Sequence, residues 1–380
     1  MLKVFATALA AVSTTALLIA APARADMLMD ELVEFPATIF FLSAGVPGAV
    51  VAVVKGDETA VYGFGETKKG SGIEPTGDST IRIGSITKAF TGQVLAHAVA
   101  EGEVAFTTPA ADHVSGELGE ALKGVPPLLL IDLVTHSGGF PREVPRDPSD
   151  DPADPFATIT YDAFAGWIAE NGLLFEPGSA VLYSNFGFDI LSAALSGAAG
   201  KPFDTLVEET ITGPLGMEDT GYARSERYPE LAMYGHGFDG EPLPHIVTGD
   251  VITGSGGLTT TANDMVKWMR WHLEKDGPDA EARLLDHAVY RSRGDFDMVS
   301  GMDESGRMSG MGLAWVAMNA TEGSPFILQK AGGMQGELSY VALAPAHGVG
   351  VFVSINAYNF SAAAAMAEFA NELNAELSGY

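Results

Sequence analysis

The sequence predicts an α+β protein in which one antiparallel sheet, flanked by helices, is built from both ends of the chain and carries an inserted all-helical domain. Three observations predict this architecture. Strand-like runs lie near the N-terminus, short β-rich runs separated by turns follow residue 250, and helical segments joined by Pro- and Gly-rich loops fill the middle. We therefore expect residues 26–104 and 251–380 to form the sheet domain and residues 105–250 the helical domain.

The first 25 residues have the features of an export signal that is removed. Lys3 precedes an uncharged apolar stretch, and Ala23-Arg24-Ala25 supplies the small residues of a cleavage site before Asp26. A membrane anchor is the alternative, but the apolar stretch is short and ends at that cleavage site. A lipid anchor would need a Cys after the cut, and the chain has no Cys. We therefore expect residues 1–25 to be a signal peptide and the mature protein to have no stable membrane anchor.

Two helices and a hairpin are expected before the helical domain. Apolar positions at helical spacing predict a helix over residues 27–43. Residues 50–54 and 60–63 predict two strands, and Lys55-Gly56-Asp57 predicts the turn that joins them. Residues 86–101 again carry apolar side chains at helical spacing and predict the second helix.

The later elements return to strands after one long loop. Residues 141–156, rich in acids and prolines, predict an exposed excursion within the helical domain. Residues 312–318, 338–344 and 348–355 are short β-rich runs typical of an antiparallel meander. Residues 362–377 predict a closing Ala-rich amphipathic helix.

The composition excludes several classes of function. The chain has 21 basic and 49 acidic residues, a formal net charge of −28, so it would repel a nucleic acid. The absence of Cys excludes disulfides, thiolate catalysis and zinc–thiolate sites. The eight His include no His-x-x-x-His pair, so we expect no metal and no other cofactor.

Ser85-Ile86-Thr87-Lys88 is the first candidate catalytic motif. It lies where an extended segment meets a predicted helix, and residues three apart share a helix face, so Lys88 should point toward Ser85. A serine hydroxyl needs an adjacent base, and a lysine can be that base when burial and nearby cations lower its pKa. The alternative is that Ser85 merely caps a helix. No other Ser of the chain has a Lys three residues later.

Two further motifs carry chemistry. Tyr183-Ser184-Asn185 opens an apolar helix, and a Tyr hydroxyl can take and return a proton while an Asn amide holds a substrate or the lysine. Its alternative role is again a helix cap. Lys330-Ala331-Gly332 follows an apolar stretch, so we expect Lys330 on an edge strand beside the nucleophile, where it could bind a carboxylate. The glycines that follow would let backbone N–H groups approach an oxyanion.

In this order, the three motifs resemble those of the class C β-lactamase and low-molecular-mass penicillin-binding protein family. Three further strings agree with it: residues 133–138, 214–217 and 254–260. The resemblance covers about residues 30–378 and is closest to the AmpH-type D-alanyl-D-alanine carboxypeptidase/endopeptidases. That closer likeness rests on three strings: residues 301–303, 312–316 and 329–333.

The resemblance implies a β-lactamase/transpeptidase-like fold and a periplasmic serine hydrolase that works through an acyl-enzyme. Ser85 would attack the carbonyl, and Lys88 and Tyr183 would move protons, with the principal base left open. The implied substrate-binding residues are Asn185, Lys330 and Gly332. The implied oxyanion hole consists of the backbone N–H groups of Ser85 and Gly333.

The third motif departs from the family, which usually has Thr or Ser where this chain has Ala331. The lost hydroxyl would normally help to hold a substrate carboxylate. The first hypothesis is a DD-carboxypeptidase/endopeptidase acting on peptidoglycan stem peptides. The alternatives are an esterase of the same fold, a class C-type β-lactamase and a non-catalytic binding protein. The expected partners are peptidoglycan peptides or β-lactams and no nucleic acid, while the oligomeric state is left open.

A histidine-based triad is disfavoured by the sequence. A Ser-His-Asp hydrolase of the α/β type would show Gly-x-Ser-x-Gly, and no serine lies in that frame. His136 is the histidine nearest to a motif, and its Thr-His-Ser-Gly setting favours a turn over a catalytic role.

Overall fold

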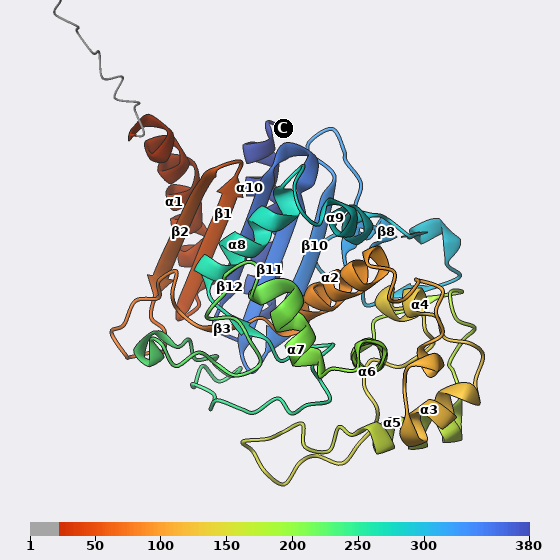
Figure 1. Cartoon of the computed structure of the whole chain (residues 1–380). Coiled ribbons are helices and arrows are strands. Elements are labelled where there is room, and N and C mark those ends of the chain that lie inside the picture. Colours follow the sequence, from red (N-terminus) through yellow and green to blue (C-terminus); the bar gives the residue numbers. More distant parts are fainter. Residues whose placement is uncertain (1–22) are drawn as a thin grey trace, which may run out of the picture.

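A computed structural model describes residues 23–380 of the chain (Figure 1). The expected signal peptide therefore lies outside the described residues, except for its last three, which begin helix α1 (Ala23–Ala44). Within residues 23–380, no helix is both long enough and apolar enough to cross a membrane.

An eight-stranded, fully antiparallel sheet forms the centre of the molecule. Its spatial order is β2-β1-β12-β11-β10-β9-β8-β6. The N-terminal hairpin joins the C-terminal strands through the β1–β12 pair, in which Val51 lies opposite Val353. The strands are β1 (Gly48–Lys55), β2 (Glu58–Gly65), β6 (Arg291–Ser292), β8 (Gly310–Met311), β9 (Val316–Met318), β10 (Ile327–Met334), β11 (Glu337–Ala344) and β12 (Val349–Ile355).

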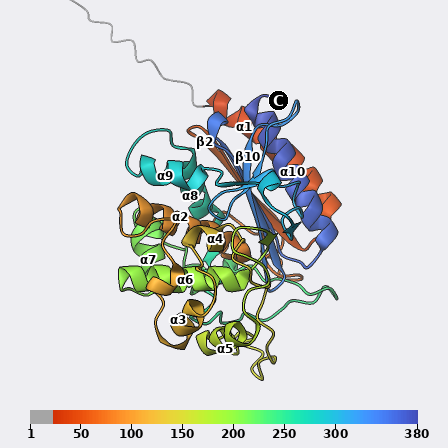
Figure 2. The same ribbon diagram turned by 90° about the vertical axis from the view of Figure 1, so that its right-hand side faces the viewer.

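Helices cover both faces of this sheet, which explains why its central strands are apolar on both sides. Figure 2 shows α1 and α10 (Phe360–Ser378) on one side of the sheet, and α2 (Thr87–Ala100), α8 (Ala262–Leu273) and α9 (Ala280–His287) on the other. The side chains of β1 alternate between these layers. Val50 packs in the cluster that contains Trp268 of α8, whereas Val51 packs in the cluster beneath α1 and α10.

The helices between the two parts of the sheet lie beside it (Figure 1). They are α3 (Gly116–Lys123), α4 (Leu130–Val134), α5 (Tyr161–Asn171), α6 (Asn185–Ala199) and α7 (Phe203–Val207). One hydrophobic cluster runs from Val50 in the sheet to Phe164 in α5, so the two parts share a continuous core. The division into a sheet domain and an inserted domain at residues 105–250 stays a prediction.

Short elements complete the described secondary structure. The antiparallel pair β3 (Ile81–Arg82) and β5 (Thr259–Thr260) lies next to the first turn of the α2 segment. The parallel pair consists of β4 (Val181–Leu182) and β7 (Val299–Ser300). The single-turn helices are η1 (Gly84–Ile86), η2 (Ala110–Asp112), η3 (Glu208–Thr212), η4 (Pro229–Leu231), η5 (Arg293–Asp295) and η6 (Pro345–His347).

Most of the elements predicted from the sequence are confirmed, and one is wrong. The predicted hairpin, both early helices, the last two strands and the closing helix all occur near their predicted bounds, and residues 141–156 contain no helix or strand. The predicted strand 312–318 is instead the turn and second arm of the β8–β9 hairpin. Ala314 adopts a left-handed φ of 67°, and Gly312 N donates to Trp315 O at 2.9 Å, which closes the turn.

Candidate active site

Ser85 is the central residue of η1, the single turn that leads into α2. Its hydroxyl accepts a hydrogen bond from Lys88 Nζ at 3.1 Å. The residue that precedes α2 is Ile86, and no side-chain hydrogen bond caps either helical segment. The cap role considered from the sequence therefore has no support in the local geometry.

Lys88 is fully buried and its ammonium group has three partners. Besides Ser85 Oγ, Nζ contacts Asn185 Oδ1 at 2.6 Å and the backbone oxygen of Ser255 at 2.6 Å. Burial lowers the pKa of Lys88 to about 7, against the opposing effect of the Asp189 and Glu143 carboxyl groups. A neutral amine would still donate to the two carbonyl oxygens, which would leave its lone pair directed at the Ser85 hydroxyl.

Tyr183 lies among three cationic groups. Lys88 Nζ is 5.0 Å from its ring centroid, Lys330 Nζ is 5.1 Å away, and the Arg142 guanidinium carbon is 4.8 Å away. Burial, together with the charges of Lys88 and Arg142, lowers the pKa of Lys330 to about 8. Three cationic side chains thus gather around Tyr183, and they could bind an anionic group of a substrate, although the carboxyl groups of Glu143 and Glu304 also lie at the site.

The second motif has both of the roles considered for it: Ser184 caps a helix, and Asn185 contacts the lysine. Ser184 Oγ accepts from Gly187 N at 2.9 Å and is the cap of α6. Asn185 instead turns toward the site, where Oδ1 accepts from Lys88 and Nδ2 donates to Glu143 Oε1. Its backbone N–H donates to the carbonyl of Arg142 at 2.9 Å.

Arg142 and Glu143 were missed by the sequence analysis. Both belong to the loop at residues 141–156, which was predicted only as an exposed excursion. No sequence spacing connects this loop to Lys88. Arg142 and Glu143 reach Asn185, a partner of Lys88, only because the loop folds back over the start of α6. Their juxtaposition with Asn185 could be found only in three dimensions.

The backbone of β10 touches η1 at a pair of glycines. A Cβ at Gly332 would lie only 3.0 Å from Ser85 N and 1.9 Å from Ile83 O. Gly84 has a φ of +48°, and a Cβ there would lie 2.6 Å from Gly333 N. Only glycine permits this approach, which brings the backbones of Ser85 and Gly333, the predicted oxyanion donors, side by side.

The prediction that Lys330 lies on an edge strand needs a correction. Strand β10 is an interior strand at Leu328 and Gln329, where it pairs with both β9 and β11. From Lys330 onward it pairs with β11 alone, because the short strand β9 ends its pairing there. The second half of β10 therefore has a free edge, and it is this half that lies against Ser85.

A cavity of about 720 Å³ opens along this edge. It is lined by most of the predicted site residues: Ser85, Tyr183, Lys330, Gly332 and Gly333. It continues past Ala331 to the start of α10, where Phe360, Ala363 and Met366 give an apolar wall. One end of the cavity is thus polar and cationic, while the other is apolar.

His136 has a packing role in this arrangement. Its ring stacks on Tyr183 at a centroid distance of 4.5 Å, and its Nδ1 accepts from Ser184 N at 3.1 Å. Burial and the nearby cations of Lys330 and Lys88 hold its pKa well below the usual range, so it is neutral. It lies in a turn with a left-handed φ of 56°, as its sequence setting predicts.

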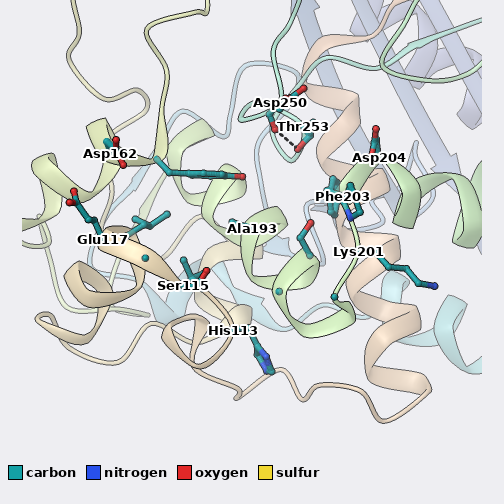
Figure 3. A pocket seen from close by; sticks show the side chains of 18 residues that line it. His113, Ser115, Glu117, Asp162, Ala193, Lys201, Phe203, Asp204, Asp250 and Thr253 are labelled. Atoms are coloured by element: carbon teal, nitrogen blue, oxygen red, sulfur yellow. Dashed lines mark hydrogen bonds between the residues drawn. The ribbon is translucent and has the colours of Figure 1, made fainter.

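A second cavity of about 720 Å³ lies among the helices, away from the three motifs (Figure 3). Its labelled charged side chains are spread out: Asp162 and Glu117 lie at one end, Lys201 and Asp204 at the other, and Asp250 lies beside Thr253. Lys201 is paired with Glu209, which does not line the cavity. Because its charged groups do not converge, the site along β10 is the better candidate active site.

Comparison with known proteins identifies the family. The family model described as Beta-lactamase matches residues 25–375. The chain belongs to the β-lactamase family. The D-alanyl-D-alanine-carboxypeptidase/endopeptidase AmpH of Escherichia coli K12 is 32% identical over 378 residues, covering 99% of this chain and 96% of AmpH. A β-lactamase of Pseudomonas fluorescens is 24% identical over 343 residues, covering 82% of this chain and 88% of its own length.

A solved structure supports the same placement. The β-lactamase/D-alanine carboxypeptidase of Yersinia pestis, in complex with citrate, is 32% identical and superposes with a TM-score of 0.82, covering 92% of this chain and 99% of that one. The predicted β-lactamase-like α+β fold and the resemblance to AmpH-type enzymes are therefore confirmed. As a member of this family, the protein is an enzyme of the serine hydrolase type.

Proposed function

We propose that this protein is an exported serine DD-carboxypeptidase/endopeptidase that cleaves peptidoglycan stem peptides through an acyl-enzyme on Ser85. The observation that carries the proposal is the hydrogen bond between Lys88 Nζ and Ser85 Oγ at the mouth of the β10 cavity. The near-full-length similarity to AmpH supports the substrate class. The proposal places the mature protein in the periplasm, after removal of residues 1–25.

Acylation begins with attack of Ser85 Oγ on the substrate carbonyl. Lys88 accepts the hydroxyl proton, for which its buried amine with a pKa of about 7 is suited near neutral pH. The oxyanion receives hydrogen bonds from the backbone N–H groups of Ser85 and Gly333. Tyr183, which lies beside both lysines, passes a proton to the leaving amine, and water then releases the acyl group by the reverse path.

Recognition of the substrate relies on the cationic end of the cavity. The C-terminal carboxylate of a stem peptide would meet Lys330, with Arg142 nearby, and the Asn185 amide would hold the peptide group and Lys88 together. The remaining length of the peptide would follow the free edge of β10, which offers unpaired backbone groups from Lys330 onward.

An esterase of the same fold is the second candidate, and Ala331 favours it. Ala331 packs with the apolar cluster under α10, and it also lines the same cavity as Lys330. A Thr or Ser there would add a donor for a substrate carboxylate. The alanine instead extends the apolar wall, which suits an uncharged acyl or alcohol group.

The test is a time course of intact protein mass for residues 26–380 mixed with benzylpenicillin, with Ser85→Ala as the control. The free drug, a peptide ending in D-Ala-D-Ala and a short acyl ester are assayed alongside. A lasting adduct on the wild type alone, together with release of D-Ala, would support the proposal. Rapid loss of the drug without a lasting adduct would indicate a β-lactamase. Ester cleavage without adduct or D-Ala release would replace the peptidase with the esterase.

A further inference from the structure

Two histidines and an aspartate meet at the ends of α8 and α9, on a different part of the molecule from the β10 cavity. His272 lies in the last turn of α8, and Asp286 and His287 end α9. Three of their atoms converge: His272 Nδ1 is 3.0 Å from His287 Nε2 and 3.5 Å from Asp286 Oδ2. The third side of this triangle, from His287 Nε2 to Asp286 Oδ2, is 3.8 Å.

These distances are those of donor atoms that share one metal ion. The point equidistant from the corners of a triangle with sides of 3.0, 3.5 and 3.8 Å lies about 2.0 Å from each corner, which is the Zn–N and Zn–O bond length. Two imidazole nitrogens and one carboxylate oxygen form a common three-ligand set for Zn²⁺. An ion at this point would lie in the plane of the three atoms, so the tetrahedral geometry with water in the fourth position needs the ligands to shift by roughly a few tenths of an ångström.

A metal requires neutral imidazoles and an ionised carboxylate. Burial raises the pKa of Asp286 well above its usual range, against the hydrogen bond from Trp315, so a metal ion would have to displace the proton of this carboxyl group.

A second observation points to a missing partner. Among the described side chains, Asp286 Oδ1 and His272 Nε2 are buried without a hydrogen-bond partner. Buried polar atoms usually have one, since leaving one unpaired costs about 1–3 kcal/mol. A metal would allow the second carboxylate oxygen to share in its coordination. His272 Nε2 would stay unpaired with a metal on Nδ1, so the missing partner is indicated by Asp286 Oδ1 alone.

The surroundings hold the ligands in place and leave an entry path. Trp315 Nε1 donates to Asp286 Oδ2 at 2.8 Å, the kind of supporting contact that orients a metal-binding carboxylate. The His272 ring packs edge-on to Trp268 at 4.4 Å and to Trp315 at 5.3 Å. The side chain of His287 is 16% exposed, so an ion can reach the site from solvent.

One nearby charge opposes a cation at this position. The Arg283 guanidinium contributes to the low pKa values of His272 and His287. It is held away from them by other contacts, since it stacks over Trp271 at 5.0 Å, donates to the backbone oxygen of Asp276 and pairs with Glu274 at 3.6 Å. Its charge weakens metal binding without occupying the triangle.

We propose that His272, Asp286 and His287 bind one Zn²⁺ ion that ties the end of α8 to the end of α9. The ion would also brace the helix that carries Lys88, because Trp268 of α8 stacks on Phe90 of α2 at 4.5 Å. Sequence spacing gave no sign of this site and predicted no metal, because the ligands are 14 residues apart and on two helices. The rival interpretation is a plain hydrogen bond between two neutral imidazoles.

The experiment uses untagged mature protein freed of metal by a chelator and then gel-filtered with one to three equivalents of Zn²⁺ at pH 7.5. Bound zinc is measured by elemental mass spectrometry, and melting is followed by circular dichroism. The proposal expects one Zn²⁺ per chain and a higher melting temperature. His287→Gln, at the exposed rim, should bind at least ~100-fold more weakly, since even supporting residues around a metal change affinity by 10- to 100-fold. The exposed His347→Gln should bind like the wild type.

Two results would overturn the proposal. One is the absence of retained zinc in the folded wild type, which would leave the hydrogen bond between the imidazoles as the whole interaction. The other is equal zinc binding in His287→Gln and the wild type. If His287→Gln failed to fold, anomalous scattering at the zinc edge from wild-type crystals would decide, because the peak must lie between the three ligands.

Discussion

Replacing Gly332 by alanine should test how much the close approach of β10 to η1 contributes to acylation, because it changes none of the other active-site side chains. The added Cβ would lie 1.9 Å from Ile83 O, 2.9 Å from Ile86 N and 3.0 Å from Ser85 N. All three are backbone atoms that cannot rotate away, so β10 or η1 must move by about 1 Å or more to reach ordinary contact distances. That movement pulls apart the two predicted oxyanion donors. Loss of one such donor costs roughly 3 kcal/mol of barrier, or about 10²- to 10³-fold in acylation rate.

The rate of acyl-enzyme formation is measured by quenched-flow mixing followed by mass spectrometry. The melting temperature is measured on the same samples. Gly166→Ala is the matched control, because Gly166 lies within α5 and an added Cβ would meet nothing within 4 Å. The control should acylate like the wild type and gain about 0.5–1 kcal/mol of stability from lower backbone entropy in the unfolded chain. A folded Gly332→Ala that acylates within about threefold of the wild type would refute the reasoning, since the predicted loss is about 10²-fold or more.

Three further predictions follow from the site and its surroundings. The acylation rate should rise with pH through about 7, because Lys88 can accept a proton only in its neutral form, and a profile that is flat between pH 5.5 and 8.5 would exclude it as the base. Ala331→Thr should lower KM for a peptide ending in D-Ala-D-Ala relative to an ester, and an unchanged ratio would show that the hydroxyl is not what selects the substrate. Trp315→Phe in metal-free protein should lower the free energy of unfolding by about 1–3 kcal/mol, because Asp286 loses its buried donor; equal urea midpoints for variant and wild type would contradict this.

The local elements could be predicted because their signals are local. The β-branched run in β1 and the helical spacing in α2 and α10 depend on neighbours a few residues away, so their bounds were found from the sequence. The β8–β9 hairpin was not, because its turn depends on the left-handed φ of Ala314, a conformation for which alanine gives no sequence signal. The backbone N–H of Ala314 donates to Val134 O at 3.1 Å, so a distant helix helps to hold that turn.

The sequence by itself determined the family and the fold class. It also determined the pairing of Ser85 with Lys88, because two residues three apart in a helical turn lie on the same face. Only the tertiary structure decided what surrounds that pair. Asn185 and Ser255, the two carbonyl partners of Lys88, are 97 and 167 residues away from it in the chain, and the free edge of β10 appears only because β9 is short. The burial that lowers the pKa of Lys88 comes from such distant segments. Local spacing can place a lysine beside a serine, but it takes the packed chain to exclude water from that lysine and so give it the chemistry of a base.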